Sequence, residues 1–258
     1  MTAFLSSPRN QNYRILRYNP RGRYSDAGEA VTIDLLAADL VALLDALRIP
    51  KAEAVVGVSL GGATALAAAL THPDRIARFM SCDTSASAPA GNRKAWEERI
   101  QMSEAEGAVR KSDYASSSEE IAHGMDLLQE GEAIVGEQLA EATAKRWFPA
   151  PAWAEDSPVL ADCQRVQAAV ASNSLAGFKA GVQALWEYDY RDCMAGYQGK
   201  GMFLVGGEDG KLPESMKAMA EGLGKEGAKL VVVDGAGHLP MVQSPEEVVK
   251  AVEALLKL

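Results

Sequence analysis

Residues 55–62 read VVGVSLGG, and this stretch decides how the rest of the chain is interpreted. A short apolar run enters a G-x-S-x-G motif centred on Ser59, and the Ala-rich run ATALAAALTH (63–72) follows it. A strand that turns sharply into a helix at a central serine is the context of a nucleophile elbow. Such a turn leaves little room two residues before and after the serine, so Gly57 and Gly61 are expected to be necessary. The alternative is a glycine-rich strand-to-helix turn that packs closely and does no chemistry.

The helix expected after Ser59 points its N-terminus at the serine. The backbone amide of Leu60 can then donate a hydrogen bond to a developing oxyanion. A serine nucleophile also needs a base, and the chain has three histidines. His72 ends the helix after the elbow, where it caps or packs, and His123 lies in a polar region with no strand before it. His238 is the candidate base, because it follows the apolar run KLVVVD (229–234) in a loop at the carboxyl end of a predicted strand.

The third member of a Ser-His-acid triad should be a carboxylate at another strand end, between the serine and the histidine in chain order. The run MFLVGGEDG (202–210) supplies a strand followed by Glu208 and Asp209. Asp209 is the predicted acid, which would hold the His238 tautomer and stabilise its charged form. Glu208 and Asp83 are the alternatives, the latter because it follows another apolar run, RIARFMSC.

Around these motifs, apolar runs and helical patterns alternate as in parallel βαβ units. We expect a strand at 13–18, a helix at 32–47 and strands ending at the elbow and near residue 82. The helix at 32–47 should bury one leucine face. That face comprises Leu36, Leu40, Leu43, Leu44 and Leu47. After a polar, helical middle, alternation resumes from residue 202. The predicted fold is α/β, with a mostly parallel sheet: residues 1–84 and 199–258 form the core, and 85–198 form a helical cap.

The quoted segments resemble those of the α/β-hydrolases, and more narrowly of 3-oxoadipate enol-lactonases. The matching stretches are YRILRYNPRGRYSDA, VVGVSLGGATALAAALTHPDRIARFMSCDTSA, LVGGEDGKLPESM and VVVDGAGHLPMVQSPEE. The resemblance implies an α/β-hydrolase fold with Ser59 as nucleophile, Asp209 as acid and His238 as base. It also implies a lactone or ester substrate.

The N-terminus departs from this pattern, because only 12 residues precede Tyr13. Family members begin with two or three further strands, the last of which leads to a loop that gives the second oxyanion amide. Those N-terminal strands are expected to be missing here, or residues 1–7 are a remnant that enters the loop. Without a replacement donor, turnover would fall on the order of 100-fold to 1000-fold.

Composition fits a water-soluble enzyme that acts on a small molecule. The 258 residues have a mean hydropathy of −0.09, and no run approaches the ~18 apolar residues of a membrane span. The net charge of −9 argues against a nucleic-acid partner. Three scattered cysteines without metal-type spacing, and an N-terminus without a signal peptide, favour the reducing cytoplasm. The sequence leaves a homo-oligomer open.

The predicted cap should select the substrate. Trp147, in the stretch KRWFPAP, is the candidate substrate-binding residue, because the resembling family carries a similar RWF stretch. An acidic enzyme with a carboxylate-bearing substrate also needs a local cation. The cap offers Arg93, Lys94, Arg99, Lys145, Arg146 and Lys179, which sequence does not separate from ordinary surface charges.

The predicted activity is hydrolysis of an ester or lactone of the enol-lactone type through an acyl-enzyme on Ser59. No metal or organic cofactor is expected, since GVSLGG lacks the lysine of a phosphate-binding loop. Two alternatives stay open. The same triad could isomerise or cyclise a lactone without net hydrolysis, or the chain could be a non-catalytic protein that binds a small ligand.

Overall fold

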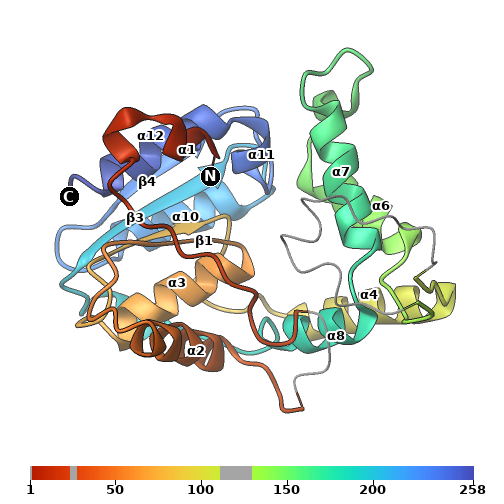
Figure 1. Cartoon of the computed structure of the whole chain (residues 1–258), viewed down its shortest axis with the longest axis horizontal. Helices are drawn as coiled ribbons and strands as arrows, with labels where there is room; N and C mark the ends of the chain where they lie inside the picture. Colours follow the sequence, from red (N-terminus) through yellow and green to blue (C-terminus); the bar gives the residue numbers. More distant parts are fainter. Residues whose placement is uncertain (1, 24–27, 111–129) are drawn as a thin grey trace. The chain divides into compact units, whose positions relative to one another are not determined.

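The chain is described from a computed structural model that covers residues 2–23, 28–110 and 130–258 (Figure 1). The first part contains α1 (Thr2–Ser6), η1 (Pro8–Asn10), α2 (Ile33–Ala46), β1 (Val55–Val58), α3 (Leu60–Thr71), β2 (Arg78–Cys82) and α4 (Asn92–Glu106). The middle contains α6 (Glu137–Trp147), η3 (Ala150–Trp153), α7 (Leu160–Ala171), α8 (Leu175–Gln183) and α9 (Arg191–Met194). The last part contains β3 (Lys200–Gly206), α10 (Leu212–Glu221), β4 (Lys229–Val233), α11 (Pro240–Gln243) and α12 (Pro245–Leu255).

The four strands form one parallel sheet in the order β1-β2-β3-β4. The register pairs Val58 with Cys82, Cys82 with Leu204, and Gly206 with Val233, so the carboxyl ends of neighbouring strands lie together. Parallel strands need crossover connections, and α3 and α10 supply two of them. The predicted α/β fold with a parallel sheet is confirmed.

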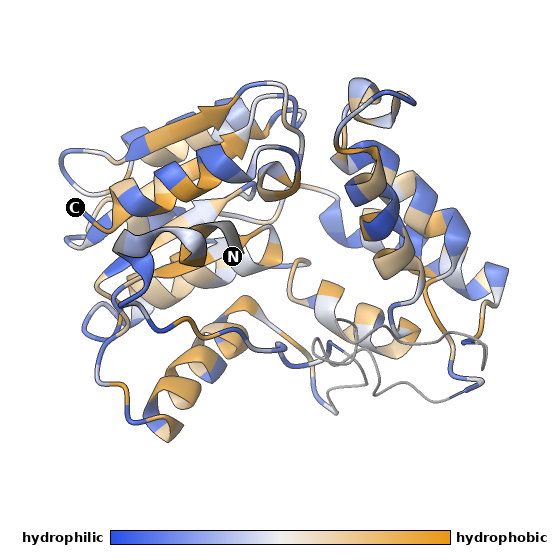
Figure 2. Cartoon of the chain, turned by 45° about the horizontal axis from the view of Figure 1, so that its top comes forward, coloured by the Kyte–Doolittle hydropathy of each residue, from blue (hydrophilic) through white to orange (hydrophobic). Residues whose placement is uncertain are grey.

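The two central strands, β2 and β3, are buried on both faces, whereas Val56 of β1 and Val232 of β4 are exposed. Successive side chains of a strand point to opposite faces of the sheet. On one face Met80 and Leu204 pack with Ala251 and Leu255 of α12 in one hydrophobic cluster. On the other face the Phe79 and Phe203 rings meet edge to face, with centroids 5.7 Å apart. Figure 1 shows α3 and α12 on opposite sides of the sheet, and Figure 2 shows hydrophobic and hydrophilic sides on the helix that leads to the C-terminus.

The predicted strand at 13–18 is wrong. The structure gives this segment no regular secondary structure and leaves Tyr13, Ile15, Leu16 and Tyr18 exposed. A strand is held by hydrogen bonds to a neighbour, and β1, the strand at that end of the order, pairs only with β2 among the described residues. Residues 13–18 therefore do not join the sheet.

Two smaller expectations also change. Leu47 lies beyond the end of α2 and is exposed, whereas Leu36, Leu40 and Leu44 are buried as predicted. Residues 2–6 form α1, which contacts α12 and is not a loop that enters the elbow region. Asn10 fastens this segment: its Nδ2 donates to the Phe4 carbonyl at 3.0 Å and to Glu253 Oε1 at 2.9 Å.

The chain divides into two compact units. Unit 1 comprises Met1–Tyr18, Ala37–Ala86 and Tyr190–Leu258 and contains the whole sheet. Unit 2 comprises Asn19–Leu36 and Ser87–Asp189, and all of its regular elements in the described ranges are helical. None of the described helices is both long enough and apolar enough to cross a membrane.

Candidate active site

Ser59 occupies the turn between β1 and α3, in a backbone conformation that is rare for a residue with a side chain. Its φ is 54° and its ψ is −117°. Non-glycine residues in such conformations cost on the order of 1–3 kcal/mol and persist only where the surroundings enforce them. The Ser59 amide donates to the Cys82 carbonyl at 2.9 Å, which ties the turn to the end of β2. This geometry is that of a nucleophile elbow.

The glycines around Ser59 have different roles from those expected. A Cβ on Gly57 would lie 2.0 Å from the Gly61 carbonyl oxygen, so the expected need for Gly57 holds. A Cβ on Gly61 would meet nothing within 4 Å, and the expected need for that glycine is wrong. It is the backbone of Gly61, and not its lack of a side chain, that shapes the turn, because this backbone lies against Gly57. The second crowded position is Gly62, whose Cβ would lie 2.7 Å from the Cys82 carbonyl oxygen.

We expect Gly57→Ala to lose most soluble, active protein and Gly61→Ala to keep it. The first change drives a methyl group into the Gly61 backbone, where no side chain can yield, at a cost of about 3 kcal/mol or more. The second places a methyl group in open space on a helix, where alanine is favoured by about 1 kcal/mol. Urea unfolding and labelling by a serine-directed probe measure both effects. Equal behaviour of the two variants would contradict this account of the turn.

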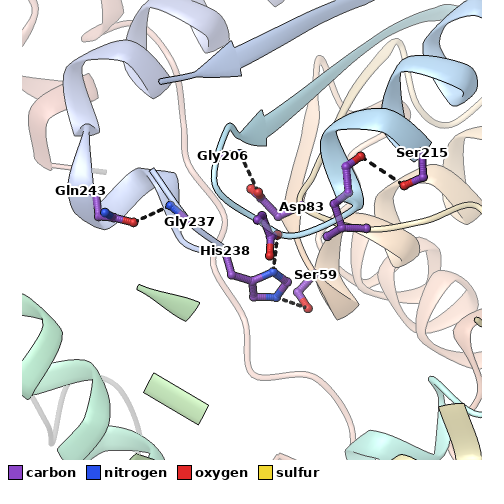
Figure 3. Close-up of polar contacts among 9 residues, drawn as sticks. Ser59, Asp83, Gly206, Ser215, Gly237, His238 and Gln243 are labelled. Carbon is purple, nitrogen blue, oxygen red and sulfur yellow. Dashed lines mark hydrogen bonds and ion pairs between the residues drawn. The ribbon is translucent and has the colours of Figure 1, made fainter. Parts of the chain in front are cut away.

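His238 lies in the loop between β4 and α11, and two contacts shape this loop. Gly235 has a φ of 72°, and Gly206 at the end of β3 lies so close that its Cβ would be 2.0 Å from the Gly237 carbonyl oxygen. Gln243 accepts a hydrogen bond from the Gly237 amide at 2.8 Å (Figure 3). Sequence reasoning missed both Gln243 and Gly206. The Gly206 contact depends on the pairing of β3 with β4, and the Gln243 contact depends on the path of the chain from the loop into α11.

The structure brings Ser59, His238 and Asp209 together in one hydrogen-bonded chain (Figure 3). His238 Nε2 is 3.0 Å from Ser59 Oγ, and its Nδ1 is 2.7 Å from Asp209 Oδ2. With Asp209 ionised, Nδ1 carries the proton and donates it to the carboxylate, and Nε2 accepts from the serine hydroxyl. These are the distances over which a base takes a proton from a nucleophile.

The two alternative acids occupy different surroundings. Glu208 is exposed, and its amide donates to the Ala236 carbonyl at 2.8 Å. Asp83 lies at the end of β2 with an exposed fraction of 1%, and its Oδ1 accepts the Gly206 amide at 2.8 Å. Burial, opposed by this hydrogen bond and reinforced by the charge of Asp209, raises the pKa of Asp83 to about 8. Burial thus favours the neutral form of the Asp83 carboxyl group.

This raised pKa makes unfolding depend on pH. Between pH 4 and 8 the unfolded chain releases the Asp83 proton while the folded chain keeps it, so stability falls as pH rises. We expect the stability of Asp83→Asn relative to the wild type to rise by about 1.4 kcal/mol for each pH unit between pH 5 and 7. Cys82, the neighbouring thiol, does not contribute to this pH dependence, because burial and Asp83 raise its pKa and it stays neutral in this window. Urea unfolding at several pH values measures the difference. Parallel curves for the two proteins would contradict the prediction.

The remaining candidate residues fall into several groups. Leu60 is the first residue of α3, where backbone amides have no acceptor within the helix. His72 caps the C-terminus of α3 and donates its amide to Ala68, as expected, and His123 lies outside the described residues. Trp147 ends α6 and is half-buried, next to the fully buried Phe148.

Most of the cap cations contact a neighbouring acid or ring. The contacts are Arg93–Glu97, Lys94–Glu98, Lys145–Glu141, Lys179–Glu104, and Arg99 stacked 4.4 Å from the Trp96 ring centroid. The four ion pairs lie between exposed side chains, where such pairs contribute little to stability. These contacts single out none of the cations as an anion-binding group.

A family model described as the alpha/beta hydrolase family matches residues 2–251, so the chain belongs to the α/β-hydrolase family. The chain is 26% identical over 249 residues to 3-oxoadipate enol-lactonase 2 of Acinetobacter baylyi, which covers 95% of this chain and 79% of that protein. The enol-lactonase structure from Burkholderia xenovorans LB400 matches with a TM-score of 0.74 at 24% identity, over 96% of this chain and 83% of that one. A hydrolase structure from Pseudomonas aeruginosa PA01 matches with a TM-score of 0.73 at 25% identity, over 96% and 82%. The resemblance read from the motifs is confirmed.

Proposed function

We propose that this chain is a serine hydrolase that opens an ester or lactone of the enol-lactone type. The observation that carries the proposal is the chain of hydrogen bonds from Ser59 through His238 to Asp209, with the serine on a strained elbow. The similarity to an enol-lactonase along nearly the whole chain supports the substrate class.

The proposed reaction has two stages. Ser59 Oγ attacks the carbonyl carbon while its proton moves to His238 Nε2, and Asp209 stabilises the imidazolium. The Leu60 amide donates to the oxyanion. Collapse of the tetrahedral intermediate breaks the ring C–O bond, and an enolate leaves. The enolate takes up at carbon the proton that His238 received from Ser59. It becomes a ketone, so ring opening is hard to reverse, and His238 is neutral again. A water molecule that loses its proton to His238 then releases the acid and restores Ser59.

We further propose that the helical segment inserted between β2 and β3 acts as the cap that selects the substrate. Its place in the chain supports this role, because it interrupts the alternation of strands and helices. Trp147 is the proposed substrate-binding side chain, since its half-buried ring leaves apolar surface available while Phe148 fills the core of the unit. The free thiols of Cys82, Cys163 and Cys193 support a cytoplasmic location.

A fluorophosphonate probe tests the nucleophile, and an enol lactone tests the substrate class. We expect one adduct, on Ser59, and a product heavier than the lactone by one water. An unchanged product mass with a new ring would favour a lactone isomerase or cyclase. An intact protein that forms no adduct and turns over no lactone or ester would favour a ligand-binding protein and overturn the proposal.

A further inference from the structure

Asp83 is a buried carboxyl group that the proposed reaction does not use. It follows the last residue of β2 and has a φ of 46°, a left-handed conformation that is uncommon for a residue with a side chain. Its amide donates to the Leu204 carbonyl at 3.0 Å, and its Oδ1 accepts from the Gly206 amide at 2.8 Å. The backbone and the side chain of Asp83 are thus both fixed to β3, the strand that leads to Asp209 (Figure 3).

The second carboxyl oxygen, Oδ2, is buried and accepts no hydrogen bond from the described residues. Asp209 acts on Asp83 through its charge and through a side-chain hydrogen bond, and both raise the pKa of Asp83. Two ionised carboxylates hold no proton between them, so a charged Asp83 would bury an acceptor without a donor. One proton between the two groups removes this conflict, because a carboxylic acid donates to a carboxylate.

We propose that Asp83 is a positioning residue: a neutral carboxylic acid whose hydroxyl donates a hydrogen bond to the Asp209 carboxylate and orients it toward His238. The proposal rests on the proposed function for the role of Asp209. It assigns the shared proton to Asp83, because Asp83 is the more deeply buried of the two. The side chain of Asp209 keeps 14% of its surface exposed and already accepts a hydrogen bond from His238 Nδ1.

The same geometry separates Asp83 from the role of triad acid. His238 Nδ1 is 2.7 Å from Asp209 Oδ2, whereas the Asp83 carboxyl group accepts the Gly206 amide through its Oδ1. Burial favours the neutral form of a carboxyl group, and neutral carboxylic acids can serve as hydrogen-bond donors in enzyme sites. The charged and titratable groups around Asp83 are Asp209, His238 beyond it, and the neutral Cys82 thiol on β2.

Two variants separate a neutral donor from a charged or merely structural group. Asp83→Asn keeps an acceptor for the Gly206 amide and a donor for Asp209, and it removes the capacity to ionise. Asp83→Leu removes both hydrogen bonds at similar volume. The readouts are kcat and KM across pH for an ester or enol lactone, and the low-field NMR resonance of the His238 Nδ1 proton. The NMR readout needs no turnover, so it separates failure of this proposal from failure of the proposed function.

If Asp83 is a neutral donor, Asp83→Asn keeps kcat/KM within about fivefold of the wild type, and the acid limb of the pH profile stays in place. Asp83→Leu lowers kcat about 100-fold with little change in KM, and it shifts the His238 resonance. A shift of the acid limb to lower pH by about one unit in Asp83→Asn would mean that a negative charge had been removed, and would overturn the proposal. Wild-type kcat and an unmoved resonance in Asp83→Leu would also overturn it. If Asp83→Leu does not fold, the Asp83→Asn profile still decides the charge state.

Discussion

Ser59→Ala is expected to lower kcat by about 10⁴-fold to 10⁶-fold while the protein stays folded. The change removes the oxygen that would form the acyl-enzyme and leaves His238 without a hydroxyl to deprotonate. It also creates no packing conflict, because alanine is smaller than serine at this half-buried position. Steady-state kinetics with an activated ester or an enol lactone measures the loss, and circular dichroism reports the fold.

Ser215→Ala is the matched control for this experiment. Ser215 lies in α10, where its hydroxyl donates to the Leu212 carbonyl at 3.1 Å, one turn back along the helix (Figure 3). The control removes a serine hydroxyl from the same unit without touching His238, so its kcat and probe labelling should match the wild type. Retention of more than about 1% of kcat by Ser59→Ala would contradict nucleophilic catalysis by this residue.

Asp209→Asn is expected to lower kcat about 10⁴-fold. The amide can donate to His238 Nδ1, which favours the tautomer with the proton on Nε2, and that tautomer cannot accept the proton of Ser59. The fold should survive, because the side chains have nearly the same shape. Kinetics over a range of pH measures the loss, and labelling by the fluorophosphonate probe should slow in parallel.

Glu208→Gln provides the control for the acid, since Glu208 precedes Asp209 in the chain and is exposed. The same neutralisation one residue away should leave kcat near that of the wild type. A large loss in Glu208→Gln together with a small loss in Asp209→Asn would contradict the assignment of Asp209.

The geometry of Ser59, His238 and Asp209 follows from features that are local in the sequence. Each residue comes directly after an apolar run, and parallel strands bring their carboxyl ends to one edge of a sheet. Ser59 also lies in a motif with glycine two residues before and after it. The close approach of Gly57 to the Gly61 backbone explains why the first of these positions is glycine. The local sequence pattern and the parallel arrangement of the strands were therefore sufficient to predict that these three residues lie close together.

Features that depend on contacts between distant segments were beyond the reach of sequence reasoning. The pattern of residues 13–18 is compatible with a strand, but only a neighbouring strand can provide its hydrogen bonds. The need for Gly62 rather than Gly61 depends on the Cys82 carbonyl of β2. The surroundings of Asp83 depend on Gly206 and Asp209, more than a hundred residues away.

The discontinuity of unit 1 affects the order in which the protein can assemble during synthesis. β1 and β2 leave the ribosome early, but β3 follows only after all of residues 87–189 has been made. Until then the apolar side chains of β2 lack their partner strand, and α1 lacks α12. Strand pairing between residues so far apart in the sequence slows folding and prolongs the exposure of unpaired, aggregation-prone strand edges. Nascent chains halted before β3 should therefore be the species most prone to aggregate and most dependent on chaperones.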